Sequence, residues 1–302
     1  MSFSGARWRW VYGEIWREKR LGFKLIRASG GGNLEVSHPD DTLLGAAALQ
    51  QAIRGALGSL PPGSPRPLFI VISIPSRHAY LGEVNVPHDE RETAIRFQIQ
   101  ELMEAAAGES DREAAFDWQL KTSLSDGNVS LAVAGIDQRQ VDEINAACRA
   151  CGLICLGITL DSIAALNGYL QMAPPTDKSA DVRFLLHGEL GRHHVRLGVF
   201  SQGVLFNESW ERSEEGFSVV RAISALERLV STWTREGATE DTAAVRLVLG
   251  GELMHEKGCE TTARRSQTLS PRLVEIPPRK ELKARWHEDV VPFGALEDLP
   301  CE

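Results

Sequence analysis

The sequence predicts an α/β fold built from two similar lobes. A short motif occurs twice: GEIWREKRLG at residues 13–22 and GELGRHHVRLG at residues 188–198. Both copies begin Gly-Glu-aliphatic-x-Arg and end Arg-Leu-Gly. The order strand, hairpin, helix, strand accompanies each copy. A proline-rich polar stretch, MAPPTDKSAD, separates the two halves, so we expect a boundary near residues 173–180 and lobes at 1–172 and 173–302.

The first lobe begins with two expected strands, at residues 8–14 and 21–27, followed by a turn at the glycine run 29–33. Asp41 is an expected N-cap for a helix that runs to about Leu57. The apolar run 68–74 is the next strand. A helix starting at Asp137, a buried strand at 153–160 and a helix starting at Asp161 complete the lobe. Asp161 itself is more typical of a helix cap than of a catalytic acid.

The order of strands and helices in the first lobe is interrupted by a segment with a different pattern. This segment predicts a small inserted subdomain at about residues 76–132. It contains the alternating stretch AYLGEVNV, a helix opened by Pro87 and Asp89, and two strands, FDWQLKT and VSLAVAGI. Helical spacing places an apolar stripe on that helix, made of Ile95, Ile99, Leu102, Met103 and Ala106. Phe97 lies off this stripe, so we expect it to be exposed.

The second lobe repeats the plan. We expect a strand at 182–190, a hairpin at 195–209, a long helix at 217–236 and a strand at 244–252 that contains the pair Gly250 and Gly251. These two glycines either allow close approach of a ligand or simply end the strand. The remaining residues, to 302, have no regular pattern.

Composition narrows the class of function. The formal net charge of −8 argues against a nucleic-acid binder, which usually has a basic surplus or stripe. The basic residues around Arg17 are interleaved with glutamates, a pattern more typical of a solvated hairpin face than of a nucleic-acid site. The N-terminal residues have no apolar segment typical of a signal peptide, and the apolar run 68–74 is too short to span a bilayer. We therefore expect a cytoplasmic protein that meets a membrane only through a partner.

Cysteine and histidine spacing gives no metal site. Cys148-x-x-Cys151 fits a redox or metal pair, but helical spacing with Val141 and Ile144 favours two small core residues. His193 and His194 are adjacent in an expected strand, so their side chains point to opposite faces and cannot bind one metal together. We expect no metal.

Tight hairpin turns present backbone N–H groups that can hold phosphates. Two such turns, one in each lobe, resemble the actin-like ATPase fold, and within it the chain resembles the PilM family of type IV pilus assembly. Related cytoplasmic domains of type II secretion and mannose-sensitive pilin systems are similar. The resemblance spans about residues 13–252 and is carried by these stretches: ISIPSRHAYLGEVNVPHDERETAIRFQIQELMEAAA, FDWQL, VSLAVAGIDQRQVDEINAACRACGLICLGITLDSIAAL, ELGRHHVRLGVFSQGVLFNES and LVLGGE.

The resemblance implies a scaffold that binds the cytoplasmic tail of an inner-membrane, PilN-like partner. The tail would dock in a groove in the first lobe beside the inserted subdomain. The candidate groove residues are Tyr80, Val84, Phe97 and Glu101. Phe97 is the candidate anchor, because an exposed aromatic side chain is a common binding hot spot; the alternative is that it packs under a neighbouring loop.

The chain departs from the family in both phosphate turns. The family usually has Asp-Ile-Gly followed by hydroxyl residues; here Glu replaces Asp in both turns, Trp16 replaces a glycine, and the hydroxyls are missing. Trp16 fits hairpin packing better than base stacking. We therefore expect a degenerate nucleotide site and weak or no binding of Mg-ATP. The candidate residues of that site are Glu14, Arg17, Glu189, Gly191, Arg192, His193, Gly250 and Gly251.

Three hypotheses of function remain. The first is a cytoplasmic interaction protein of a pilus or secretion platform, with no catalytic residue. The second is an active actin-like ATP-binding protein, an ATPase that switches assembly, or a kinase. The third is a structural homo-oligomer. No P-loop pattern and no Ser-His-Asp signature support an enzyme, and fold analogy alone is a poor reason to propose one.

Overall fold

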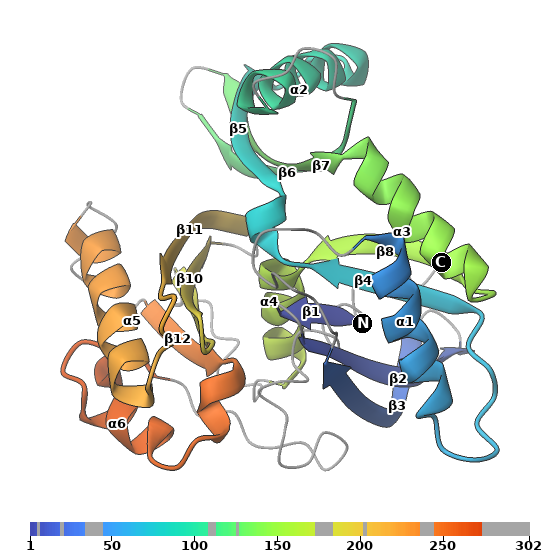
Figure 1. Cartoon of the computed structure of the whole chain (residues 1–302). Coiled ribbons are helices and arrows are strands. Elements are labelled where there is room, and N and C mark those ends of the chain that lie inside the picture. Colours follow the sequence, from blue (N-terminus) through green and yellow to red (C-terminus); the bar gives the residue numbers. More distant parts are fainter. Residues whose placement is uncertain are drawn as a thin grey trace. The chain divides into compact units, whose positions relative to one another are not determined.

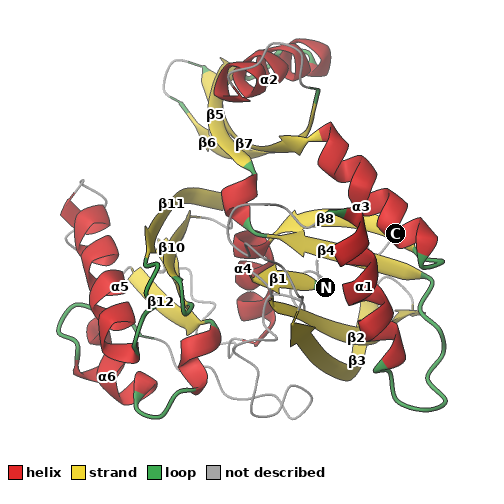
Figure 2. Cartoon of the chain, in the orientation of Figure 1, coloured by secondary structure: helices red, strands yellow, loops and turns green. Residues whose placement is uncertain are grey.

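The computed structural model describes residues 1–4, 7–18, 21–33, 45–107, 113–124, 127–172, 184–201, 204–235 and 245–273 (Figures 1 and 2). The chain divides into two compact units at Asp161/Ser162, the second running from Ser162 to Glu297. The predicted boundary at 173–180 lies outside the described residues. No described helix is long and apolar enough to cross a membrane.

The first unit contains a five-stranded mixed sheet in the order β3-β2-β1-β4-β8. Its strands are β1 Ser2–Ser4, β2 Arg7–Glu18, β3 Leu21–Asn33, β4 Phe69–Ile74 and β8 Ile154–Leu160. Two helices, α1 Ala46–Gly58 and α3 Gln138–Ala150, pack against each other. A helix was predicted to start at Asp137, and Asp137 is the N-cap of α3, where it accepts a hydrogen bond from the Arg139 backbone N–H at 2.9 Å. A short 3₁₀ helix, η1 Ser76–His78, follows β4.

A second, three-stranded antiparallel sheet belongs to the same unit and has the order β5-β7-β6. It comprises β5 Tyr80–Pro87, β6 Ala114–Ser123 and β7 Asn128–Asp137, together with the helix α2 Glu92–Ala107. Ile99 and Met103 of α2 are buried against Val133 of β7, with Ile95 and Leu102 packed beside them, so the predicted inner stripe is confirmed for these four residues. That this segment is an insertion stays a prediction.

The second unit repeats the strand order of the first. Its sheet runs β11-β10-β9-β12, with two antiparallel pairs and then a parallel pair, as in β3-β2-β1-β4. The elements are α4 Asp161–Met172, β9 Phe184–Leu190, β10 His194–Ser201, β11 Val204–Arg212, α5 Val219–Trp233, β12 Val245–Gly250, η5 Glu252–His255, α6 Cys259–Arg265 and η6 Ser270–Arg272. The predicted repeat of elements is therefore present.

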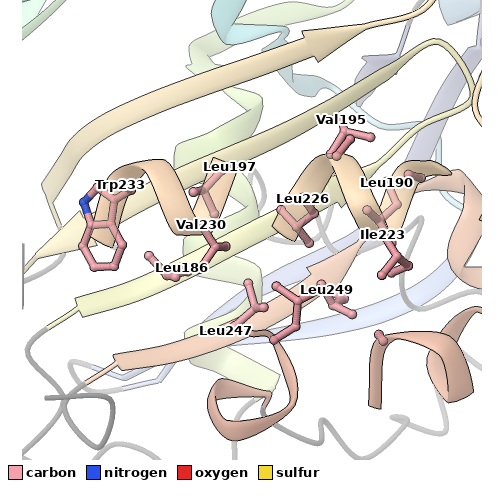
Figure 3. Close-up of a cluster of buried hydrophobic side chains, with 14 of the residues drawn as sticks. Leu186, Leu190, Val195, Leu197, Ile223, Leu226, Val230, Trp233, Leu247 and Leu249 are labelled. Atoms are coloured by element: carbon pink, nitrogen blue, oxygen red, sulfur yellow. The ribbon is translucent and has the colours of Figure 1, made fainter. Parts of the chain in front are cut away.

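The core of the second unit lies between its sheet and α5. Leu186 and Leu190 of β9 and Leu226 of α5 belong to one hydrophobic cluster, and all three are fully buried (Figure 3). The residues alternate along β9, so Leu186, Gly188 and Leu190 share the face that α5 covers, whereas His187 and Glu189 point to the opposite face. This alternation places two titratable side chains on the other side of the sheet.

The repeated residue motif does not mark equivalent positions, which corrects the prediction. Residues 188–198 span the β9–β10 turn, but residues 13–22 span the β2–β3 connection. The counterpart of the β9–β10 turn is the β1–β2 connection, where only Gly5 and Ala6 lie between Ser4 and Arg7. A few shared residues in amphipathic strands do not specify register, because strand pairing is set by backbone hydrogen bonds and by burial along the whole strand.

Three local expectations also differ. The glycine run 29–33 is part of β3, paired with residues 7–11, because backbone pairing overrides the weak strand preference of glycine. The helix α1 begins at Ala46 with Gly45 as its N-cap, so Asp41 is not the cap. The strand β8 is the edge strand of its sheet, and Ile154 and Leu156 are 58% and 48% exposed rather than buried.

Candidate functional site

Six of the predicted nucleotide-site residues lie at one end of the sheet in the second unit. Glu189 is next to the last residue of β9, and it lies beside Gly250, the last residue of the parallel strand β12. Gly191, Arg192 and His193 form the β9–β10 turn, and Gly251 follows β12. Backbone pairing therefore places the second lobe's candidates together, as the sequence predicted.

Glu189 is held by an internal cation. The guanidinium of Arg196, directly opposite on β10, forms an ion pair with Oε2 of Glu189. Arg196 is fully buried and also lies 3.4 Å from Oε1 of Glu208 on β11. Burial would raise the pKa of Glu189, but the Arg196 charge and the hydrogen bond with His194 hold it well below its usual range. Glu189 is therefore ionised, and Arg196 already balances its charge.

The other carboxylate oxygen of Glu189 is engaged by His194. Its Nε2 lies 3.2 Å from Oε1 of Glu189. The rings of His194 and Trp210 are 5.7 Å apart, and the Arg196 guanidinium lies 5.2 Å from the Trp210 ring. Trp210 Nε1–H in turn donates to Glu208 at 3.2 Å. We call Glu189, His194, Arg196, Glu208 and Trp210 the charged network; a hydrated magnesium ion at Glu189 would have to compete with it.

Arg192 is bound to carboxylates at the tip of the turn. Its guanidinium donates to Glu252 at 2.6 Å and to Glu256 at 2.8 Å. The turn is also tied to the chain after β11, because the carbonyl of Arg192 accepts from the Phe217 backbone N–H at 2.5 Å. Arg192, which the sequence predicted in the nucleotide site, is therefore already paired with two carboxylates.

The glycines at this end are explained by close packing of the protein itself. Gly251 has φ +97°, and a Cβ there would lie 2.7 Å from the backbone N of Leu190. A Cβ on Gly191 would lie 2.8 Å from the His194 ring. The sequence left open whether Gly251 allows close approach of a ligand or ends a strand. Its positive φ and its close approach to β9 explain the glycine without a ligand.

The two histidines of the motif are separated as predicted. His193 is exposed in the turn, with Nδ1 3.4 Å from the Ser213 carbonyl oxygen, whereas His194 faces Glu189. The described part of the chain contains no group of three or more His, Cys, Asp or Glu side chains that could hold a metal ion.

The first-lobe candidates lie on β2. Glu14 pairs with Leu25 and Arg17 with Gly22 in the β2–β3 ladder, and Trp16 pairs with Phe23. They are therefore not in the connection equivalent to the β9–β10 turn, because β2 continues to Glu18 before the chain reverses.

Asp161 contacts the segment after β4. Its Oδ1 accepts hydrogen bonds from the backbone N–H of Ser76 at 2.9 Å and from the Ser76 hydroxyl at 3.0 Å. It is buried, and both Asp161 and Ser76 belong to the first unit. Asp161 thus links two segments that are far apart in sequence.

The predicted partner residues divide into two groups. Tyr80 and Val84 are partly buried and pack against the core beneath α2. Phe97 is 64% exposed, which confirms that it lies off the inner stripe, and Glu101 is also exposed on α2. The arrangement leaves Phe97 and Glu101 as the accessible candidates.

Sequence reasoning missed Arg196, Glu208 and the buried His187. Their signal was the alternation of polar residues along three neighbouring strands: 187 and 189, 194 and 196, 208 and 210. Such a pattern predicts a polar sheet face, but not that the face is buried. His187 is 4% exposed, and neither of its ring nitrogens has a hydrogen-bond partner among the described residues.

Comparison with known proteins identifies the fold. No protein-family model and no curated protein matches the chain. Among solved structures, the chain is similar to a chain of the PilM-PilN type IV pilus biogenesis complex, with a TM-score of 0.68, 16% identity, and coverage of 98% of this chain and 96% of that chain. It is also similar to the cytoplasmic domain of EpsL, an inner membrane component of the type II secretion system of Vibrio cholerae. That match has a TM-score of 0.54 and 13% identity, and covers 99% of this chain and 94% of that chain.

The chain has the PilM-like, actin-like fold. The predicted fold class is thus confirmed by alignments that cover nearly the whole of both chains.

The buried His187 predicts a pH dependence of stability. Burial, and secondarily the Arg196 charge, lower its pKa from 6.5 to about 4, so the unfolded chain binds more protons than the folded chain between these values. The folded state therefore has its full stability, as far as His187 determines it, above pH 6.5. That part of the unfolding free energy is lost as the pH falls toward 4. Lowering the pH from 7 to 5 should cost about 2 kcal/mol of unfolding free energy through this residue.

Chemical denaturation across that pH range measures the effect. We expect His187→Leu to flatten the profile by about 2 kcal/mol, whereas the exposed control His193→Leu should keep the wild-type profile. Equal slopes for His187→Leu and wild type would contradict the assignment of a neutral, buried His187.

Proposed function

We propose that the chain is a cytoplasmic interaction protein of a type IV pilus or related secretion platform. It binds the cytoplasmic tail of a PilN-like inner-membrane partner and reaches the membrane through that partner. The observation that carries the proposal is the near-complete structural match to a chain of the PilM-PilN complex. The similarity to the EpsL cytoplasmic domain supports the same setting, since EpsL is an inner membrane component of a secretion system.

We assign the partner site to the surface of α2 around Phe97 and Glu101. Phe97 is a large apolar side chain left mostly exposed, while the inner face of the same helix is occupied by its own core. The neighbouring Arg96 is ordered by Glu92, with a 2.9 Å ion pair, and lies 4.9 Å from the Trp118 ring. Aromatic side chains are common anchors of binding sites, so we place the partner's tail at this exposed aromatic residue and its charged neighbours.

The nucleotide site is proposed to be degenerate. Three features support this: Glu189 is neutralised by Arg196, Arg192 is paired with Glu252 and Glu256, and the turn lacks the family's hydroxyl residues. Losing two hydrogen bonds to a charged ligand would cost about 3–6 kcal/mol, or about two to four decades of affinity. The second candidate function, an active ATP-binding switch, requires the charged network to rearrange.

Partner binding is tested with the tail of the membrane protein that co-purifies with the chain from native cells. We expect Phe97→Ala to weaken binding of that labelled peptide by about 2 kcal/mol, or about 30-fold, in fluorescence anisotropy. Glu101→Arg, tested as a separate variant, should also weaken binding. Val220→Ala is the matched control, since Val220 is an apolar residue of α5 that is 63% exposed. Folded Phe97→Ala and Glu101→Arg variants with wild-type affinity would place the groove elsewhere.

Nucleotide binding is tested by isothermal titration with Mg-ATP and by an assay of phosphate release. We expect no hydrolysis and no dissociation constant tighter than about 1 mM, on the donor-loss estimate above. A low-micromolar constant that Glu189→Ala weakens would show instead that the site binds nucleotide, and would favour the ATP switch.

A further inference from the structure

The strand β8 is the outer strand of the five-stranded sheet, and among the described strands it pairs with β4 alone (Figure 2). In an edge strand, alternate backbone N–H and C=O groups point away from the sheet and have no ladder partner. Such a row of groups is a template on which another extended strand can pair. The outer edge of β8 is therefore a surface on which a further strand can dock.

The sequence of β8 leaves this edge unprotected. Ile154–Leu160 reads ICLGITL and contains neither a charged residue nor a proline. Charged residues and prolines are common means by which proteins prevent pairing at an edge. The five other edge strands of the described sheets all carry at least one of them: Lys24 and Arg27 in β3, Glu83 and Pro87 in β5, Asp117 and Lys121 in β6, Glu208, Glu211 and Arg212 in β11, and Arg246 in β12.

Exposed apolar side chains gather at the same place. Of the nine large apolar side chains that are exposed among the described residues, four belong to β8 or to the start of β4: Leu68, Phe69, Ile154 and Leu156. Phe69 lies beside Ile154 in the β4–β8 ladder, and the carbonyl of Leu68 accepts from the Ile154 backbone N–H at 2.9 Å. Neighbouring exposed apolar side chains of this kind mark interaction surfaces.

We propose that β8 pairs antiparallel with β8 of a second copy of the chain, so that the two five-stranded sheets become continuous. A two-fold axis makes such a contact self-complementary. The other described edge strands of a second copy would bring a charge or a proline into the new ladder, whereas β8 brings Ile or Leu at positions 154, 156, 158 and 160. Because the contact uses the same edge in both copies, it closes at a dimer.

The pairing with β4 shows how much of β8 is regular. The register shifts at Leu156, and residues 157–160 then continue the parallel ladder with β4. The new contact does not use the proposed partner site, since α2 packs on the separate sheet β5-β7-β6. The inference therefore does not rest on the proposed function.

Sedimentation velocity of the full-length chain under reducing conditions tests the dimer. Concentrations from about 1 μM to about 100 μM bracket dimers of moderate affinity, and we expect a reversible dimer in this range. Leu156→Lys places two lysines at the interface and should raise the dimer dissociation constant at least about 10-fold. Leu120→Lys is the matched control and should leave it unchanged, because Leu120 is a 54% exposed residue of the edge strand β6.

Amide hydrogen exchange locates the contact without a variant. Peptides that cover Ile154–Leu160 should exchange more slowly at about 100 μM than at about 1 μM, because the outward N–H groups of β8 are then bonded to the second copy. Peptides that cover β6 should exchange equally at both concentrations.

Four outcomes would overturn the proposal. The first is a chain that stays monomeric over the whole range, and the second is a dimer that Leu156→Lys leaves intact. The third is a dimer in which exchange at β8 does not depend on concentration, which would place the contact elsewhere. The fourth is a monomer whose β8 becomes protected only when the tail peptide of the co-purified membrane protein is added, which would assign the edge to that partner.

Discussion

The ion pair between Arg196 and Glu189 is the constraint on which the second unit's sheet depends. The guanidinium is fully buried, and it sits on the sheet face opposite the apolar core that α5 covers. Removing a buried charge from its partner typically costs several kcal/mol, because the remaining charge has no compensation. Trp210 and His194 pack around the pair, and Glu208 accepts from both Arg196 and Trp210. The polar side chains of this face are therefore paired with one another, apart from the buried His187.

This network gives a physical reason for the proposed degenerate site. A hairpin that holds a metal-bound phosphate needs an acidic group that is free to bind hydrated cations and donors that point to the ligand. Here the acidic group already has a cation from the neighbouring strand, and the turn's arginine has two carboxylates. The proposed partner-binding site is instead the surface of α2, beside the three-stranded sheet, where Phe97 is exposed.

The fold was largely predictable because its signals are local and repeated. Alternation along the strands, the inner stripe of α2 and the helix start at Asp137 each predicted an observed feature. Register was not predictable in the same way: the copies of Gly-Glu-aliphatic at Gly13 and Gly188 lie on non-equivalent strands, because pairing depends on partners far along the chain. For the same reason the sequence predicted that Glu189, Gly191 and Gly250 lie together, but could not show that Arg196 forms an ion pair with Glu189.

A double-mutant cycle on the ion pair tests the central claim most directly. Unfolding free energies would be measured for Arg196→Met, Glu189→Gln and the double variant. If Glu189 is a structural partner of Arg196, the single change Arg196→Met should cost about 3–5 kcal/mol, and adding Glu189→Gln should recover about 2 kcal/mol of it. A loss below about 1 kcal/mol for Arg196→Met, or single effects that simply add in the double variant, would contradict the account.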